Sequence, residues 1–344
     1  MTAGRQERKA LFAERDGARV RCTLCPHLCL LEEGRDGICR VRGVRDGSLR
    51  TLVYGRPATV AVDDIESKQL YHFRPGTRVM SLGTLGCNVL CSGCQNWQIS
   101  HAGAGKGEAE KLTYLSPGKA VQAAKRYKAA GVVFTYNEPV VWLEYVRDVF
   151  VVGKEAGLYT ALATAGYMSD EAFCCVASHV DAVRFDLKAP DEHGYQQFTK
   201  AKEAGQALSI AIQAKEVYGC HMEVVSNIIP GMNDGDEGLH AMASWIVGHL
   251  GPDTPWHVTR FSPDFELSYI LPTPLATLER AAAIGRKEGL RFVYVGNVQG
   301  HASRQTVCPS CGRTAIHRDD RTATQILVKG GCCAFCGEDL NVVQ

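Results

Sequence analysis

The chain has 344 residues, of which 45% are hydrophobic and 22% charged, and its formal net charge is +1. This composition predicts a large folded core and excludes a mostly disordered protein, and the near-neutral charge argues against a nucleic-acid partner. No apolar run approaches the roughly 20 residues that a membrane span needs, and the charged N-terminus lacks the apolar core of a signal peptide. We therefore expect a cytoplasmic protein with no membrane partner.

The first part of the chain, residues 1–75, is rich in arginine and glycine and shows little helical periodicity. Short strands are expected at 49–55 and 58–62. Four cysteines fall in this part, namely Cys22, Cys25, Cys29 and Cys39. We predict an N-terminal Cys-rich metal-binding segment over 1–75. Zinc is favoured there over an auxiliary iron–sulfur cluster, although the spacings fit either.

The middle of the chain alternates apolar runs with amphipathic segments. Strands are expected at 78–86, 131–136, 158–164, 181–187, 221–227, 256–261 and 291–296. Helices are expected at 116–131, 138–157, 237–250 and 277–289, the first with Ser116 as its cap and Gly131 as its stop. These strand–helix repeats predict an α/β fold with a parallel (β/α) TIM-like barrel, partial or full, over 76–300. An open doubly wound sheet is the alternative.

The last part of the chain, residues 301–344, holds two matching C-x2-C-G knuckles. Their cysteines are Cys308, Cys311, Cys333 and Cys336, and Cys332 competes with Cys333. Two such knuckles predict a zinc-ribbon-like module with four cysteines around one zinc ion.

Polar residues recur where the expected strands end, which is where a parallel barrel gathers its chemistry. They are Asn137, Glu138, Thr164, Asp186, Lys188, Asn227, His257, Arg260 and Asn297. We interpret them as parts of one shared site.

A third cysteine group lies in the loop after the first barrel strand. Cys87, Cys91 and Cys94 have the spacing C-x3-C-x2-C. Three soft thiolates in one loop suit three corners of a cubane iron–sulfur cluster and leave one iron without a protein ligand. A structural zinc site would need a fourth ligand, and the nearest spare cysteine is Cys174. The loop therefore predicts a redox centre whose open iron binds a small molecule.

These segments resemble the radical SAM superfamily, and more closely the AmmeMemoRadiSam-system radical SAM protein family, which is related to pyruvate formate-lyase activating enzyme. The segments that carry the resemblance are CTLCPHLCLLEEGRDGICRVR, LYHFRPG, GCNVLCSGCQNWQIS, YNEP, DLK, NIIPGMND, PWHVTRFSP and VYVGNVQG. The resemblance implies a β/α barrel, a 4Fe–4S cluster on Cys87, Cys91 and Cys94, and S-adenosylmethionine (SAM). It also implies a one-electron donor such as flavodoxin or ferredoxin, and a 5′-deoxyadenosyl radical that abstracts hydrogen from a substrate.

The resemblance further implies roles for the strand-end residues. Asn137 and Glu138 match the segment that meets the methionyl amino group. Lys188 would pair with the methionyl carboxylate and Asp186 with a ribose or ammonium group, the alternative being a salt bridge between the two. His257 matches a histidine near the nucleoside. Arg260 would hold an anionic group or form an ion pair at the rim, and Asn297 would approach the adenine or close the barrel.

The sequence departs from related activases at 163–166, where two polar side chains are replaced by Ala163 and Ala165. We therefore expect a divergent member whose substrate is a small molecule such as a sugar or nucleoside, altered by epimerisation, decarboxylation or dehydration. An activase that forms a glycyl radical on a partner protein is a second hypothesis. A non-catalytic, zinc-organised interaction module is a third.

Overall fold

The computed structural model describes residues 8–344, and its main body is an eight-stranded sheet in the order β14-β13-β12-β11-β10-β9-β8-β7. The strands are β7 (Thr59–Asp64), β8 (Arg78–Gly83), β9 (Gly131–Phe134), β10 (Tyr159–Thr164), β11 (Ala182–Asp186), β12 (His221–Ile228), β13 (Trp256–Arg260) and β14 (Val293–Gly296). Strands β8 to β14 run parallel, and β7 pairs antiparallel with β8. Within the described chain β14 and β7 are the free edges of this sheet, so the predicted barrel is confirmed as a partial one.

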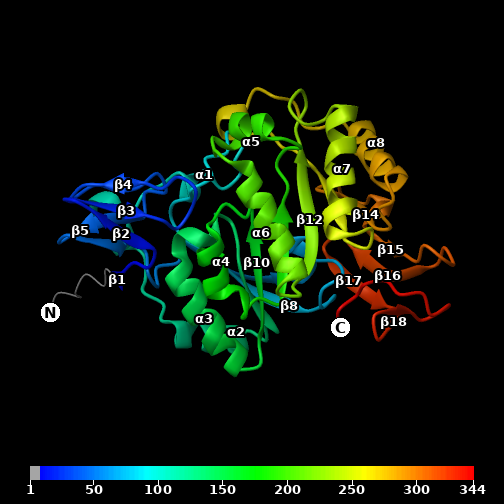
Figure 1. Cartoon of the computed structure of the whole chain (residues 1–344). Coiled ribbons are helices and arrows are strands. Elements are labelled where there is room, and N and C mark those ends of the chain that lie inside the picture. Colours follow the sequence, from blue (N-terminus) through cyan, green and yellow to red (C-terminus); the bar gives the residue numbers. More distant parts are fainter. Residues whose placement is uncertain (1–7) are drawn as a thin grey trace.

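Helices cover the outside of the sheet (Figure 1). They are α2 (Pro117–Arg126), α3 (Leu143–Glu155), α4 (Asp170–Ala177), α5 (Glu192–Thr199), α6 (Ala204–Glu216), α7 (Asp236–Leu250) and α8 (Leu275–Lys287), while the short α1 (Trp97–Ser100) lies at the carboxyl end of the strands. Every residue of β9 and β10 is buried, because these strands have helices on one face and the barrel interior on the other. Among the described residues, none of the helices combines the length and the apolar character that crossing a bilayer requires.

Helix α2 begins as predicted but ends earlier. The Ser116 hydroxyl accepts a hydrogen bond from the Lys119 backbone N–H at 3.4 Å, which is the interaction expected of a cap. The predicted stop at Gly131 is wrong, since α2 ends at Arg126 and Gly131 is the first residue of β9. A Cβ atom at Gly131 would lie 2.1 Å from the ring of Tyr159. This glycine therefore allows neighbouring strands to pack and does not terminate a helix.

Two small antiparallel sheets form the N-terminal part. One contains β1 (Arg8–Lys9), β5 (Arg42–Arg45) and β6 (Ser48–Thr51), and the other contains β2 (Ala13–Asp16), β3 (Arg19–Cys22) and β4 (Leu30–Leu31). Strand β7 also falls within the segment 1–75 but joins the barrel sheet as its edge. The Cys-rich sheets are therefore separate from the barrel strands that follow them.

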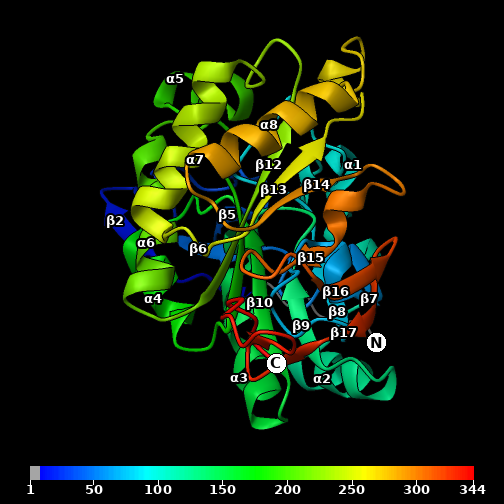
Figure 2. The same ribbon diagram turned by 90° about the vertical axis from the view of Figure 1, so that its right-hand side faces the viewer.

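The C-terminal strands pack near the open edge of the barrel, on the side away from the N-terminal sheets (Figures 1 and 2). They are β15 (Thr306–Val307), β16 (Thr314–Asp319), β17 (Thr322–Ile326), β18 (Val328–Lys329) and β19 (Cys332–Cys333). Buried Arg318 connects the two parts. Its guanidinium donates to Tyr71 O at 2.7 Å and lies 4.2 Å from the centre of the Tyr71 ring. The C-terminal strands therefore help to close a barrel that its own strands leave open.

Candidate active site

A cavity of about 520 Å³ opens at the carboxyl ends of the barrel strands. Cys87, Cys91 and Cys94 line it, together with residues at or just after the carboxyl ends of β9, β11, β12 and β14. A second cavity of about 610 Å³ is lined by Cys220 and His221, at the amino end of β12. None of the sequence-predicted site residues is among those that line the second cavity. The site chemistry is therefore concentrated at the carboxyl end, as the strand-end pattern predicted.

The cysteine loop between β8 and α1 is held by backbone hydrogen bonds to the end of α5. Leu90 N donates to Thr199 O at 2.9 Å, and Ser92 N donates to Phe198 O at 3.1 Å. Burial raises the pKa of the Cys87 thiol well above its ordinary value and that of Cys91 to about 12. These thiols carry their protons unless a metal displaces them.

The three sulfur atoms are spaced more widely than the ligands of one ion. Within residues 8–344, the C-terminal cysteines form the one group of three or more potential ligands whose ligand atoms all lie within 4.8 Å of one another. The thiols of the Cys87–Cys94 loop therefore do not surround one tetrahedral metal. Three thiols on one cavity wall fit a cluster in which each binds a different iron.

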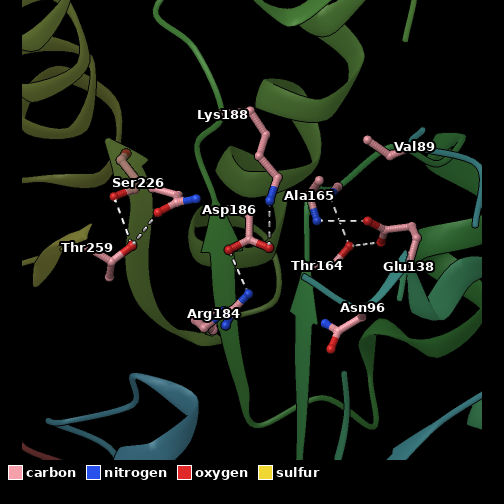
Figure 3. A network of polar contacts seen from close by, with 12 residues as sticks. Val89, Asn96, Glu138, Thr164, Ala165, Arg184, Asp186, Lys188, Ser226 and Thr259 are labelled. Atoms are coloured by element: carbon pink, nitrogen blue, oxygen red, sulfur yellow. Dashed lines mark hydrogen bonds and ion pairs between the residues drawn. The ribbon is translucent and has the colours of Figure 1, made fainter. Parts of the chain in front are cut away.

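A buried carboxylate lies on the cavity wall at Glu138, directly after β9 (Figure 3). One of its oxygens accepts a hydrogen bond from the Thr164 hydroxyl, and the other accepts from Ala165 N at 2.9 Å. Burial raises the pKa of Glu138 to about 7. A neighbouring ammonium group would favour the ionised form of this carboxylate. Two hydrogen bonds thus hold the Glu138 carboxylate in place on the cavity wall, in a position that suits a cationic ligand.

Three charged side chains, Arg184 and Asp186 on β11 and Lys188 just after it, lie together at the carboxyl end of this strand (Figure 3). Asp186 pairs with Arg184 at 2.6 Å and with Lys188 at 3.2 Å. Although burial alone would lower the pKa of Lys188, the Asp186 carboxylate raises it, so the side chain stays cationic. Burial has the opposite effect on the carboxylate and would raise the pKa of Asp186. The positive charges of Arg184 and Lys188 outweigh this effect and hold that pKa below its ordinary value. The group carries a net positive charge and suits an anionic ligand.

Six of the nine predicted strand-end residues line the cavity, namely Asn137, Glu138, Asp186, Lys188, Asn227 and Asn297. Asn137 also stabilises the loop, since its Oδ1 accepts from Thr84 N at 3.2 Å and its Nδ2 donates to Gly86 O at 2.5 Å.

The other three predicted residues do not line the cavity. Thr164 is buried behind Glu138 and orients its carboxylate. His257 is buried inside the barrel, where its Nε2 lies 2.7 Å from Glu223 Oε2 and its ring stacks on Tyr294. Arg260 donates from Nε to Thr273 O at 3.0 Å. Because none of the three lines the cavity, their contacts with the cofactor stay predictions.

Several cavity residues were missed by sequence reasoning, among them Asp63, Lys68, Arg184 and Arg321. Lys68 pairs with Asp63 at 2.7 Å and reaches the site from the short helix η1 (Ile65–Lys68). Arg184 alternates with Asp186 along β11, and this spacing would have indicated a shared face. Lys68 and Arg321 lie outside the predicted barrel, and no local pattern marks them.

The family model described as the radical SAM superfamily matches residues 81–246. This range runs from β8 to α7 and includes the three-cysteine loop, Glu138 and Lys188. The chain belongs to the radical SAM superfamily. Membership confirms the superfamily predicted from the motifs and makes the protein an enzyme of the radical SAM class. The AmmeMemoRadiSam assignment stays a prediction.

Proteins similar to this chain cover different shares of it. An uncharacterized protein of Methanocaldococcus jannaschii is 37% identical over 98% of this chain and 99% of its own length. The pyruvate formate-lyase-activating enzyme of Clostridium pasteurianum is 29% identical over 57% of this chain and 77% of its own. The structure of a radical SAM methyltransferase from Sphaerobacter thermophilus aligns with a TM-score of 0.49 at 16% identity, over 65% of this chain and 67% of that one.

Radical SAM membership implies SAM and a 4Fe–4S cluster. The cavity fits both, because it offers three thiols from one loop, the buried carboxylate of Glu138 for an ammonium group and the half-buried ammonium of Lys188 for a carboxylate.

Proposed function

We propose that this radical SAM enzyme cleaves SAM reductively and uses the 5′-deoxyadenosyl radical to abstract hydrogen from a small-molecule substrate. The observation that carries the proposal is the meeting of Cys87, Cys91 and Cys94 with Glu138 and Lys188 in one cavity. When bound, the 4Fe–4S cluster supplies the electron for cleavage of the sulfonium. The chain itself binds and orients SAM and excludes water.

The charged residues of the cavity match the two ends of the methionyl group. The Glu138 carboxylate would accept hydrogen bonds from the amino group, and Lys188 would pair with the carboxylate. Thr164 and Asn137 would act as positioning residues, because each orients a neighbouring group through hydrogen bonds. Asp186 would keep Lys188 charged and extended toward the cavity.

SAM cleavage in reconstituted protein tests the function. The protein is loaded anaerobically with iron and sulfide, reduced with dithionite and mixed with SAM. We expect 5′-deoxyadenosine and methionine in equal amounts. Protein that takes up a full complement of iron and still releases neither product would contradict the proposal.

Replacing Glu138 by Gln should weaken SAM binding by about 10- to 100-fold, because a charge-assisted hydrogen bond contributes about 1.5–3 kcal/mol. Equilibrium dialysis with the reconstituted protein measures the change. The matched control is Glu108→Gln, an isosteric change at a carboxylate whose side chain is 51% exposed and lies outside the cavity. Equal affinities in the two variants would refute the role of Glu138.

A small-molecule substrate is favoured over a partner protein. The activases among the similar proteins share 22–29% identity with this chain, and the activase hypothesis has no further support. The non-catalytic hypothesis is set aside because the superfamily indicates an enzyme.

If the reaction is redox-neutral, Tyr136 is placed to return a hydrogen atom to the substrate radical, because it lines the cavity. A reduced flavodoxin or ferredoxin would supply the electron.

We further propose a structural zinc ion on the four C-terminal cysteines. Cys308 Sγ lies 3.6 Å from Cys336 Sγ, and Cys311 Sγ lies 3.8 Å from Cys333 Sγ. Zinc–sulfur bonds of about 2.3 Å in a tetrahedron put the sulfurs about 3.8 Å apart. Cys308 and Cys333 are also part of the apolar cluster that joins this module to Tyr71 and Tyr294 of the barrel region. The ion would therefore stabilise the contact that closes the barrel.

The neighbouring cysteines Cys332 and Cys333 provide a matched pair of variants. We expect Cys333→Ser to lose one zinc ion per chain and to lower the melting temperature, because Cys333 belongs to the four-cysteine group. Cys332→Ser should keep the zinc, since the Cys332 thiol points to Gly330 O instead. Zinc analysis and thermal unfolding check both variants. If Cys332→Ser lost the zinc and Cys333→Ser kept it, the ligand would be Cys332, and the proposed set of four cysteines would be wrong.

A further inference from the structure

The four N-terminal cysteines surround one small buried pocket. Cys22, Cys25, Cys29 and Cys39 all line it. The local fold brings them together, since Cys22 N donates to Cys29 O at 2.9 Å, and the turn that follows Cys25 closes through a hydrogen bond from Leu28 N to Cys25 O at 3.1 Å. Four thiols on one pocket wall, in two small sheets with little core of their own, indicate a metal centre.

The spacing of these sulfurs distinguishes between the two metals that the sequence left open. Across residues 8–344, only the C-terminal cysteines meet the 4.8 Å spacing of ligands around a single ion. The N-terminal cysteines share a pocket but are spread more widely. In this respect they match the loop of Cys87, Cys91 and Cys94 and differ from the zinc knuckles. A cubane cluster does not require sulfurs as close as those around a single ion, because each thiolate binds a separate iron.

This pocket lies directly behind the cysteine loop of the active site. Cys25 and Cys87 belong to the same buried apolar cluster, with Val89 and Tyr167. Between them stands Asn88, which is 2% exposed. Its side chain donates to Tyr167 O at 2.7 Å, and its backbone carbonyl oxygen lies 2.9 Å from His27 Nε2. Asn88 is the residue after Cys87 and also lines the pocket of the N-terminal cysteines, so one residue borders both cysteine groups.

A second contact joins the two groups on the other side of Cys87. Gly86 has a positive φ of 78°, and a Cβ atom there would lie 2.3 Å from Cys39 O. Only glycine lets the two loops approach so closely. The exposed side of the pocket faces solvent, since Leu28 and Ile38 beside it are 47% and 40% exposed. The pocket therefore lies between the protein surface and the active-site loop.

The charge around the pocket suits a centre with net negative charge. Arg42 lines the pocket and is 1% exposed. Its partner Glu144 balances its charge from the side of α3. A cubane cluster with four thiolates carries negative charge in both of its redox states, and the cationic member of this neutral ion pair is the one that lines the pocket.

We propose that Cys22, Cys25, Cys29 and Cys39 hold a second 4Fe–4S cluster, which relays electrons from an external donor to the active-site cluster. The relay role rests on the function proposed above. One electron leaves the reduced flavodoxin or ferredoxin, which is oxidised by one electron. The same electron reduces the outer cluster and then passes to the inner one, and no atom or proton is transferred in either step.

Metal content tests the site separately from the function. We expect the anaerobically reconstituted protein to hold about eight iron atoms, four for each cubane. The variant with Cys87, Cys91 and Cys94 replaced by Ala should keep about four iron atoms, on the N-terminal cysteines alone. The variant with Cys22, Cys25, Cys29 and Cys39 replaced by Ser should keep the other four. Loss of zinc with unchanged iron in this second variant would overturn the proposal.

The wild-type protein gives a further readout should the N-terminal variant fail to fold. Two reduced clusters this close would couple magnetically, so the fully reduced protein should show a broadened EPR spectrum that integrates to two spins per chain. A spectrum of one spin, in protein with about four iron atoms, would also overturn the proposal. Absence of SAM cleavage in protein with two clusters would instead refute the proposed function and leave the outer site standing.

The source of the electron tests the relay. In the N-terminal variant, SAM cleavage driven by reduced flavodoxin should fall by about tenfold or more. Cleavage driven by a small reductant such as titanium(III) citrate, which diffuses into the cavity, should change far less. The control is Cys174→Ser, at an exposed cysteine on α4. An equal fall with both reductants would assign the N-terminal cysteines a structural role only.

Discussion

The variant with Cys87, Cys91 and Cys94 all replaced by alanine should release no measurable 5′-deoxyadenosine from SAM. Without these thiols the cavity has no ligands for the active-site cluster, and without the cluster no electron reaches the sulfonium. The backbone hydrogen bonds that hold the loop, from Leu90 and Ser92 to the end of α5, do not involve the sulfur atoms. We therefore expect a folded protein that has lost its chemistry.

Three measurements test this prediction for the triple variant. Product release is followed by liquid chromatography, bound iron by elemental analysis and folding by circular dichroism. Cys174→Ala serves as the control, because it removes a thiol that lies exposed on α4. Cleavage at the wild-type rate by the triple variant would show that these cysteines are not the catalytic ligands.

Glu144→Gln should cost about 3–5 kcal/mol of unfolding free energy, because it leaves a buried cation without its counter-ion. Arg42 and Glu144 have side chains only 1% and 2% exposed, and Arg42 Nη1 lies 2.9 Å from both Glu144 oxygens. The same carboxylate accepts a hydrogen bond from Leu11 N at 2.8 Å. Since Arg42 lies on β5 and Glu144 on α3, the pair fastens the Cys-rich sheets to the barrel.

Denaturant unfolding of the anaerobic protein measures this cost. The comparison is Lys111→Ala, which removes an ion pair whose side chains are 69% and 51% exposed. Exposed pairs of this kind contribute about 1 kcal/mol or less. Similar small losses in both variants would mean that the Arg42–Glu144 pair does not anchor the N-terminal part.

The barrel strands could be predicted because their signal is local. Strands such as β9 and β10 are buried on both faces, so they read in the sequence as short continuous apolar runs. The parallel order then follows from the alternation of strands and helices. Gly131 misled the prediction because a glycine after an amphipathic segment signals a helix end, whereas here it accommodates the ring of Tyr159.

The parts of the site that could not be predicted depend on contacts between distant segments. His257 follows the expected pattern of a strand-end residue, but its environment is set by Glu223 on the neighbouring strand. Lys68 and Arg321 reach the cavity from segments before and after the barrel strands. Cysteine spacing in the sequence fits either zinc or iron–sulfur at the N-terminal site, because the metal depends on how the folded chain places the sulfurs.

In the proposed mechanism, three cysteines leave one iron open, and SAM would bind to this iron between Glu138 and Lys188. EPR of the reduced, iron-loaded protein before and after addition of SAM tests it most directly, in the variant that lacks the four N-terminal cysteines so that one cluster is observed. We predict a shift of the g values when SAM is added, because its amino and carboxylate groups become ligands of the cluster. A cluster signal that stays unchanged at saturating SAM would contradict the account.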